Sequence, residues 1–128
     1  MKTEEKDRAR EQARAQLESI LEMVAALEKA DSDADGEKAR ETITSDPLSV
    51  EIRSVWHPVS TEAPGEYMIL LCTGGPAVRI FGKLNKHDEP ESASIEYQDW
   101  GTVWTDYPLD DNEEKQVLTY CEQFYFGE

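Results

Sequence analysis

Three aspartates alternate with other residues in the segment Asp31–Gly36 (DSDADG), which matches the opening of an EF-hand calcium loop. Such a loop ends with a bidentate glutamate at its twelfth position. Here that position holds Thr42, and Glu41 comes one residue early. Without this ligand the loop lacks its main closing contact. We interpret the segment as an acidic connection between helices, and we predict no metal site and no cofactor.

Nucleophilic chemistry would need an activated thiol or hydroxyl beside a base. The two histidines, His57 and His87, fall in polar or proline-flanked loops, and Cys72 lies inside an apolar run, where a thiol is inert. The segment Thr73–Pro76 (TGGP) lacks the spacing of a phosphate-binding loop and is typical of a hairpin turn. We therefore predict no catalytic residue, and a small enzyme is the third of three interpretations.

Acidic and aromatic residues are concentrated in the last third of the chain. Residues 85–128 contain twelve acidic residues and only two lysines, which accounts for two thirds of the net charge of −15. Carboxylates that lie beside large aromatic rings suit a basic partner, because they combine ion pairing with stacking on arginine. The predicted partner-binding residues are Glu96, Asp99, Trp100, Trp104, Asp106, Asp110 and Asp111. The alternative for the tryptophans is one ring in the core and one over the sheet edge.

The overall charge also excludes some partners. A strongly negative chain is unsuited to direct contact with nucleic acid or with an anionic membrane, since both require clustered lysine and arginine. No run approaches the ~18 apolar residues of a membrane span, and the first residues lack the apolar stretch of a secretory signal. We expect a cytoplasmic protein whose partner is basic.

Helical periodicity dominates the first third of the chain. Residues 3–29 are predicted to form one helix, with an apolar stripe at Ala13, Leu17, Ile20, Val24 and Leu27. Two heptads are too few for an isolated coiled coil, so this stripe must pack on the domain or on a second copy of the chain. A second short helix is predicted over Glu37–Ile43, before Asp46-Pro47 ends helical structure.

After Pro47 the apolar residues recur at every second position, which predicts strands. Residues 48–53 alternate as a half-buried strand, 67–72 form an apolar run typical of a strand covered on both faces, and 77–84 and 92–100 return across the sheet. Gly101 permits a bend into 102–107. A last helix is capped by Asp110 or Asp111, has an apolar stripe at Val117, Leu118, Cys121, Phe124 and Tyr125, and ends at Gly127.

The predicted fold is α+β: an N-terminal helix, a short second helix, an antiparallel meander of about four strands, and a C-terminal helix packed on the sheet. The N-terminal helix occupies residues 1–30. An acidic linker with the short helix occupies residues 31–46, and the antiparallel core domain occupies residues 47–128.

Five segments of the chain are distinctive: Gln16–Ile20 (QLESI), Pro47–Ser54 (PLSVEIRS), Leu70–Ile80 (LLCTGGPAVRI), Glu96–Thr102 (EYQDWGT) and Phe124–Glu128 (FYFGE). Together they resemble a family of small acidic proteins carried by bacteriophages and other mobile elements. Members of this family differ mainly in the helical insert, here Asp31–Ser45. The resemblance carries over no catalytic residue. It implies a gene that acts against host defences, as anti-CRISPR proteins and other nucleic-acid mimics do.

The first interpretation is therefore a phage-type inhibitor or regulatory binding protein in the cytoplasm of a host bacterial cell. Its acidic, aromatic-rich face would block a basic, nucleic-acid-binding surface of a host protein. The alternative is a structural or scaffold phage protein that forms a homodimer through the N-terminal helix, with acidity that serves only solubility.

Overall fold

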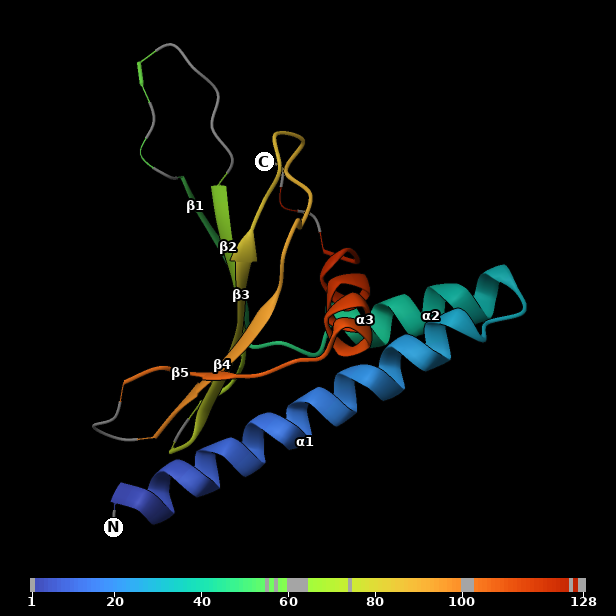
Figure 1. The fold of residues 1–128 in the computed structure, drawn as a ribbon. Coiled ribbons are helices and arrows are strands. Elements are labelled where there is room, and N and C mark those ends of the chain that lie inside the picture. Colours follow the sequence, from blue (N-terminus) through green and yellow to red (C-terminus); the bar gives the residue numbers. More distant parts are fainter. Residues whose placement is uncertain are drawn as a thin grey trace.

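The fold is α+β, and the described residues form three helices and one five-stranded antiparallel sheet (Figure 1). The computed structural model describes residues 2–54, 56, 58–59, 65–73, 75–99, 103–124 and 126. In chain order the elements are α1 (Lys2–Glu28), α2 (Asp33–Thr44), β1 (Ser49–Ser54), β2 (Gly65–Cys72), β3 (Ala77–Lys83), β4 (Ser94–Gln98), β5 (Thr105–Tyr107) and α3 (Asp111–Cys121).

The strands lie in the order β1-β2-β3-β4-β5, so the predicted antiparallel meander is confirmed, with five strands instead of about four. Alternate residues of β3 and β4 face the core, as the period of two predicted. Val78, Ile80, Ile95 and Tyr97 are buried, while the residues between them are only partly covered. This alternation fixes which face of the sheet the helices cover.

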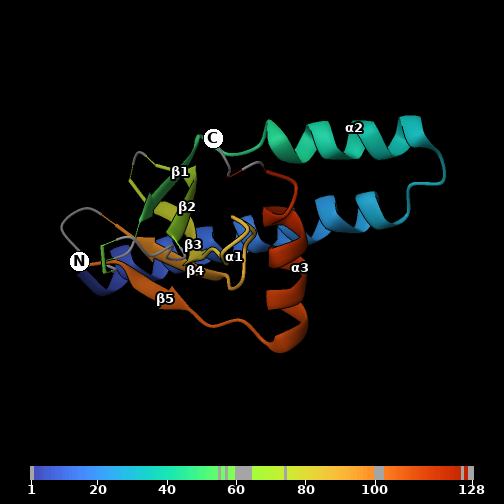
Figure 2. The ribbon, with the colours of Figure 1, turned by 90° about the horizontal axis from the view of Figure 1, so that it is seen from above.

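All three helices lie on the same side of the sheet (Figures 1 and 2). The predicted stripe of α1 packs there: Ala13, Leu17, Ile20 and Val24 are buried, and Leu27 packs at the margin of the core. Of the two interpretations of this stripe, packing on the protein's own sheet is the observed one. The surface proposed for a homodimer is thus covered within a single chain.

Helix α2 begins four residues earlier than predicted. The Ser32 hydroxyl caps it and accepts a hydrogen bond from the Asp35 backbone N–H at 3.1 Å. Asp33 and Asp35 therefore lie in the first helical turn, where negative charge stabilises the helix dipole. Two of the three aspartates that resemble a calcium loop are thus part of a helix N-terminus. Ile43 joins the core formed by α1 and the sheet, so residues 1–30, 31–46 and 47–128 share one core.

Two predictions about burial in the first strands were wrong. Val50 and Ile52 of β1 are 37% and 54% exposed, because β1 is an edge strand beyond the cover of the helices. In β2 only alternate residues, such as Tyr67 and Ile69, are buried. Met68 and Leu70 are partly exposed on the opposite face, so β2 is covered on one side and not on both.

The C-terminal helix is capped as predicted. Asp110 and Glu113 form a capping box in which each side chain accepts a hydrogen bond from the other's backbone N–H, at 2.7 Å and 3.0 Å. Val117 and Cys121 are buried, and so is Tyr120, which the predicted stripe omitted. The helix ends at Cys121. Leu118 and Phe124 pack against the core, while Tyr125 and Gly127 lie outside the described residues.

Within the described residues, no helix combines the length and the apolar character needed to cross a membrane.

Candidate functional site

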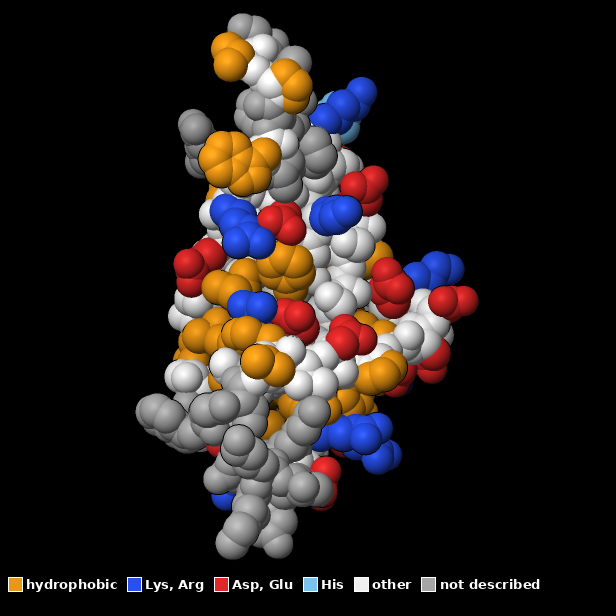
Figure 3. Space-filling model, turned by 60° about the vertical axis from the view of Figure 1, so that its left-hand side comes forward, with side chains coloured by type: hydrophobic (Ala, Val, Ile, Leu, Met, Phe, Trp, Pro, Cys, Tyr) orange, Lys and Arg blue, Asp and Glu red, His pale blue; other side chains and the backbone are white. Residues whose placement is uncertain are grey.

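The helices leave one face of the sheet uncovered, and we call it the open sheet face. It is formed by the residues of each strand that alternate with the core positions, among them Glu51, Arg53, Glu66, Met68, Leu70, Arg79, Phe81, Glu96 and Asp106. Hydrophobic and charged side chains are intermixed on this face (Figure 3). Partly exposed apolar groups framed by charges are typical of surfaces that bind another protein.

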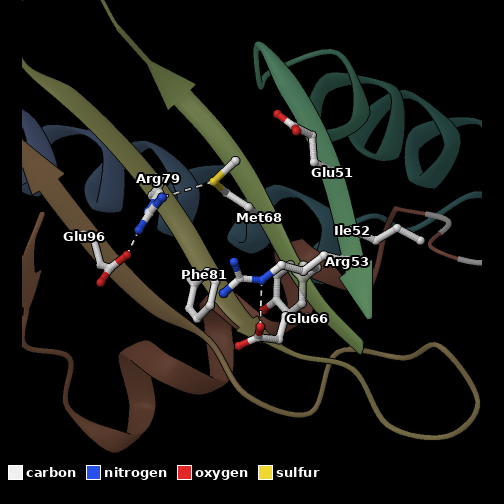
Figure 4. Close-up of a pocket in the computed structure, with 9 residues that line it drawn as sticks. Glu51, Ile52, Arg53, Glu66, Met68, Arg79, Phe81 and Glu96 are labelled. Carbon is white, nitrogen blue, oxygen red and sulfur yellow. Dashed lines mark hydrogen bonds and ion pairs between the residues drawn. The ribbon is translucent and has the colours of Figure 1, made fainter. Parts of the chain in front are cut away.

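Arg79 makes the largest number of described contacts on the open sheet face. Its Nε donates to Glu96 Oε1 at 2.8 Å, and its Nη1 lies 3.3 Å from the Met68 sulfur (Figure 4). Its guanidinium lies 4.0 Å from the centre of the Trp104 ring and 5.6 Å from that of Phe81. These contacts combine an ion pair with cation–π stacking, and they hold Trp104 against the sheet.

Arg53 forms a parallel arrangement on the other side of Phe81. Its Nε donates to Glu66 Oε1 at 2.8 Å, and its guanidinium lies 5.7 Å from the Phe81 ring centre. Arg53, Phe81, Arg79 and Trp104 thus form a row across the sheet, which we call the arginine–aromatic row. A cavity of about 360 Å³ lies along it, lined also by Glu51, Met68 and Glu96 (Figure 4).

The charges of this face are only partly neutralised. Both arginines of the row are paired with glutamates, whereas Glu51 and Asp106 form no ion pair with any residue that the structure describes. Both of these carboxylates are exposed. Asp106 lies directly opposite Glu96 on the neighbouring strand, so the row ends beside two carboxylates of which one has no described countercharge. A cation from outside would be favoured there.

Three of the seven predicted partner-binding residues meet at this place. Glu96 and Asp106 are cross-strand neighbours, and Trp104 stacks on the arginine that pairs with Glu96. The prediction expected Trp104 to stack on an arginine of a partner. In the structure the protein's own Arg79 takes that position.

Asp99 was wrongly predicted as a surface carboxylate. It is 2% exposed and accepts a hydrogen bond from the Arg8 side chain at 3.0 Å, on the helix side of the sheet. The period of two that buries Ile95 and Tyr97 continues to Asp99 and could have revealed this. Its role is to connect α1 to the end of β4.

The remaining predicted residues lie elsewhere. Asp110 and Asp111 belong to the start of α3, and Asp110 is engaged in the capping box. Trp100 lies outside the described residues. The sequence prediction also missed Arg53, Arg79 and Phe81. Their position between core residues places them on the open sheet face, but the contacts among them depend on a strand register that sequence alone does not give.

Burial disfavours the charged forms of the two thiols and of two tyrosines. It raises the pKa of Cys121 to about 12, and it raises the pKa of Cys72 and of Tyr67 and Tyr120 above their ordinary values. Tyr67 donates a hydrogen bond to the Ser92 carbonyl and Tyr120 donates one to Asp46, so both phenols have structural roles. In the described part of the chain, no three His, Cys, Asp or Glu side chains are placed to hold a metal ion.

Comparison of the chain with protein-family models, with curated proteins and with solved structures found no match.

Proposed function

We propose that this chain is a non-catalytic inhibitor of the type carried by phages and other mobile elements. It would bind a basic, nucleic-acid-binding surface of a host protein in the bacterial cytoplasm. The observation that carries the proposal is the open sheet face, where the arginine–aromatic row ends beside the exposed carboxylates Glu51 and Asp106. The resemblance to acidic phage proteins supports the same proposal.

The binding mode follows from the chemistry of this face. Lysine and arginine side chains of the partner would pair with Glu51 and Asp106, while apolar groups of the partner would cover Met68, Leu70 and Phe81. The row is held by ion pairs within the protein, so little side-chain entropy is lost on binding. The partner's affinity for nucleic acid would be lost by competition, since the same cationic side chains cannot bind both.

The net charge of −15 adds a long-range component. It would accelerate encounter with a positively charged partner and make the affinity depend on salt. Asp99 contributes nothing to this surface, and Asp110 contributes mainly to helix stability. The carboxylates proposed to meet the partner therefore lie on the two edge strands, β1 and β5, and not along the whole acidic segment of the sequence.

The test begins with affinity capture of the tagged chain from its host and identification of the protein that it retains. Binding of that protein is then measured from about 50 to about 500 mM salt, where a steep loss of affinity is expected. Removing both open-face charges with Glu51→Gln and Asp106→Asn should weaken binding by roughly tenfold or more. Retention that is equally strong at both salt concentrations would overturn the electrostatic mechanism.

A matched control removes the same charge from another part of the surface. Glu37 and Glu41 are exposed on α2, away from the sheet, so Glu37→Gln with Glu41→Gln changes the net charge equally. This variant should bind nearly as well as the unmodified chain. If both double variants weaken binding to the same extent, overall charge alone explains the affinity, and the open sheet face is not the binding site.

The scaffold alternative and the enzyme alternative have less support. The apolar stripe of α1 is covered by the protein's own sheet, which leaves the scaffold interpretation without its interface. The described thiols have raised pKa values, which is the opposite of what a nucleophilic cysteine needs.

A further inference from the structure

Strand β1 exposes apolar side chains to an unusual extent. Ile52 is 54% exposed on the helix side of the strand. Leu48, just before the strand, is 59% exposed, and Trp56, just beyond it, is fully exposed. In the described ranges no strand pairs with the outer edge of β1. A six-residue edge of this kind is a template for pairing with another chain, and natural proteins rarely leave one uncovered. The other edge strand, β5, has only three residues.

We propose that β1 of a second copy of this chain pairs with β1, antiparallel and related by a two-fold axis that lies midway between the two strands at the level of Ile52. The proposal does not depend on the proposed function; in the dimer Glu51 has a countercharge from the second copy, and Asp106 is then the carboxylate of the open sheet face left for a basic partner. Because the axis is perpendicular to the sheet, it preserves the faces of the sheet, so helix-side residues meet helix-side residues. The axis must therefore lie at the level of a residue, which then faces its own copy, and not at the level of the peptide bond between two residues.

Charge favours Ile52 over its two neighbours, Glu51 and Arg53, as the residue at the level of the axis. With the axis at Ile52, Glu51 lies opposite the partner's Arg53 and Arg53 lies opposite the partner's Glu51. Moving the axis to Glu51 would place Glu51 opposite the partner's Glu51, and moving it to Arg53 would place Arg53 opposite the partner's Arg53. Like charges directly opposite each other destabilise a strand pair, whereas opposite charges stabilise it.

The same register covers exposed apolar surface. Ile52 meets the partner's Ile52 across the axis, so the exposed apolar side chain in the middle of β1 is covered in the dimer. The two sheets would join into one of ten strands, with the two open sheet faces side by side.

The experiment measures the mass of the full chain by sedimentation equilibrium over a range of concentrations near 0.15 M salt. The unmodified chain is expected to form a dimer. Glu51→Arg places two pairs of arginines opposite each other, and Arg53→Glu places two pairs of glutamates opposite each other. Each variant alone should dimerise more weakly, by roughly fivefold to thirtyfold. An equimolar mixture should form a heterodimer, because unlike charges then face each other at every position.

Controls separate the interface from folding and from net charge. All variants are compared by circular dichroism, and Ile52→Asp, which places two carboxylates at the axis, serves as a second disrupting variant. Glu37→Arg makes the same charge change as Glu51→Arg on an exposed position of α2 and should leave the dimer intact. The proposal is overturned if the unmodified chain is monomeric at every concentration, if the single variants dimerise as well as it does, or if their mixture does not associate.

Discussion

At the scale of single residues, Gly82 shows how closely the core side of β3 approaches its neighbours. A Cβ atom there would collide with the Ser92 carbonyl oxygen and would lie 2.8 Å from Cε1 of the Tyr67 ring. Tyr67 pairs with Gly82 across the sheet and donates a 2.6 Å hydrogen bond to the same carbonyl. Gly82→Ala should therefore lower the free energy of unfolding by about 2 kcal/mol or more, measured by urea denaturation.

Gly36 provides the matched comparison. It lies inside α2, and a Cβ atom there would meet nothing within 4 Å. Gly36→Ala should raise the free energy of unfolding by about 0.5–1 kcal/mol through helix propensity. A loss of stability in Gly36→Ala, or none in Gly82→Ala, would contradict this difference between an open and a crowded position.

Cys121 makes stability depend on alkaline pH. Burial raises the pKa of its thiol to about 12 in the folded protein, whereas the unfolded thiol titrates near its ordinary value of about 8.5. Below that ordinary value the thiol is protonated in both states, so burial of the neutral thiol contributes in full to the free energy of unfolding. Above it only the unfolded state loses the proton, so stability falls. From pH 7.5 to pH 9.5 the free energy of unfolding should drop by about 1 kcal/mol.

Substitution of Cys121 shows whether its thiol causes this drop in the free energy of unfolding. Cys121→Ala should remove most of the pH dependence in this range and leave the smaller contribution of Cys72, whose pKa is also raised by burial. An unchanged dependence in Cys121→Ala would assign the effect to other groups.

At the scale of elements, α3 shows how one residue type can be interpreted in two ways. Asp110 and Asp111 were both predicted as partner-binding carboxylates, yet Asp110 closes a capping box with Glu113. Asp110→Ala should lower the free energy of unfolding by about 1 kcal/mol, whereas Asp111→Ala should cost only a few tenths, through the helix dipole. Urea denaturation of the two variants distinguishes them, and equal losses would contradict the capping role.

The elements themselves followed largely from periodicity, and the errors have identifiable causes. The alternation of Ile95 and Tyr97 correctly predicted the buried side of β4. The same alternation at Val50 and Ile52 predicted a half-buried strand, but a pattern of apolar residues does not reveal whether any helix reaches far enough to cover them. The early start of α2 was signalled by Ser32, three residues before Asp35, and was missed because the aspartates were interpreted as a loop.

The candidate site was less accessible from the sequence than the fold. An acidic and aromatic composition identified Glu96, Trp104 and Asp106, which do lie together. It could not identify Arg79 as the residue that joins them, because the pairing of Arg79 with Glu96 depends on the register between β3 and β4. Composition also gave no means of separating Asp99, which is buried against Arg8, from carboxylates that face solvent.

At the scale of the whole molecule, 28 acidic residues oppose 13 basic ones, and the folded state brings these charges closer together than the unfolded chain does. Mutual repulsion should therefore destabilise the folded protein at low ionic strength, and salt should relieve it. We expect the melting temperature to rise by a few degrees between about 50 and about 500 mM salt. The described ion pairs that are exposed oppose this trend only weakly, since such pairs are worth about 0–1 kcal/mol.

The variant that removes the charges of Glu37 and Glu41 tests the same explanation. These two glutamates are four residues apart on α2, where like charges destabilise a helix. Glu37→Gln with Glu41→Gln should therefore melt at a higher temperature in low salt and gain less from added salt than the unmodified chain. A melting temperature that falls as salt rises would mean that internal ion pairs, such as Arg79–Glu96 and Arg8–Asp99, outweigh the net repulsion. In that case the acidity would stabilise the fold through local pairing, and its proposed role as a surface for a basic partner would lose its physical basis.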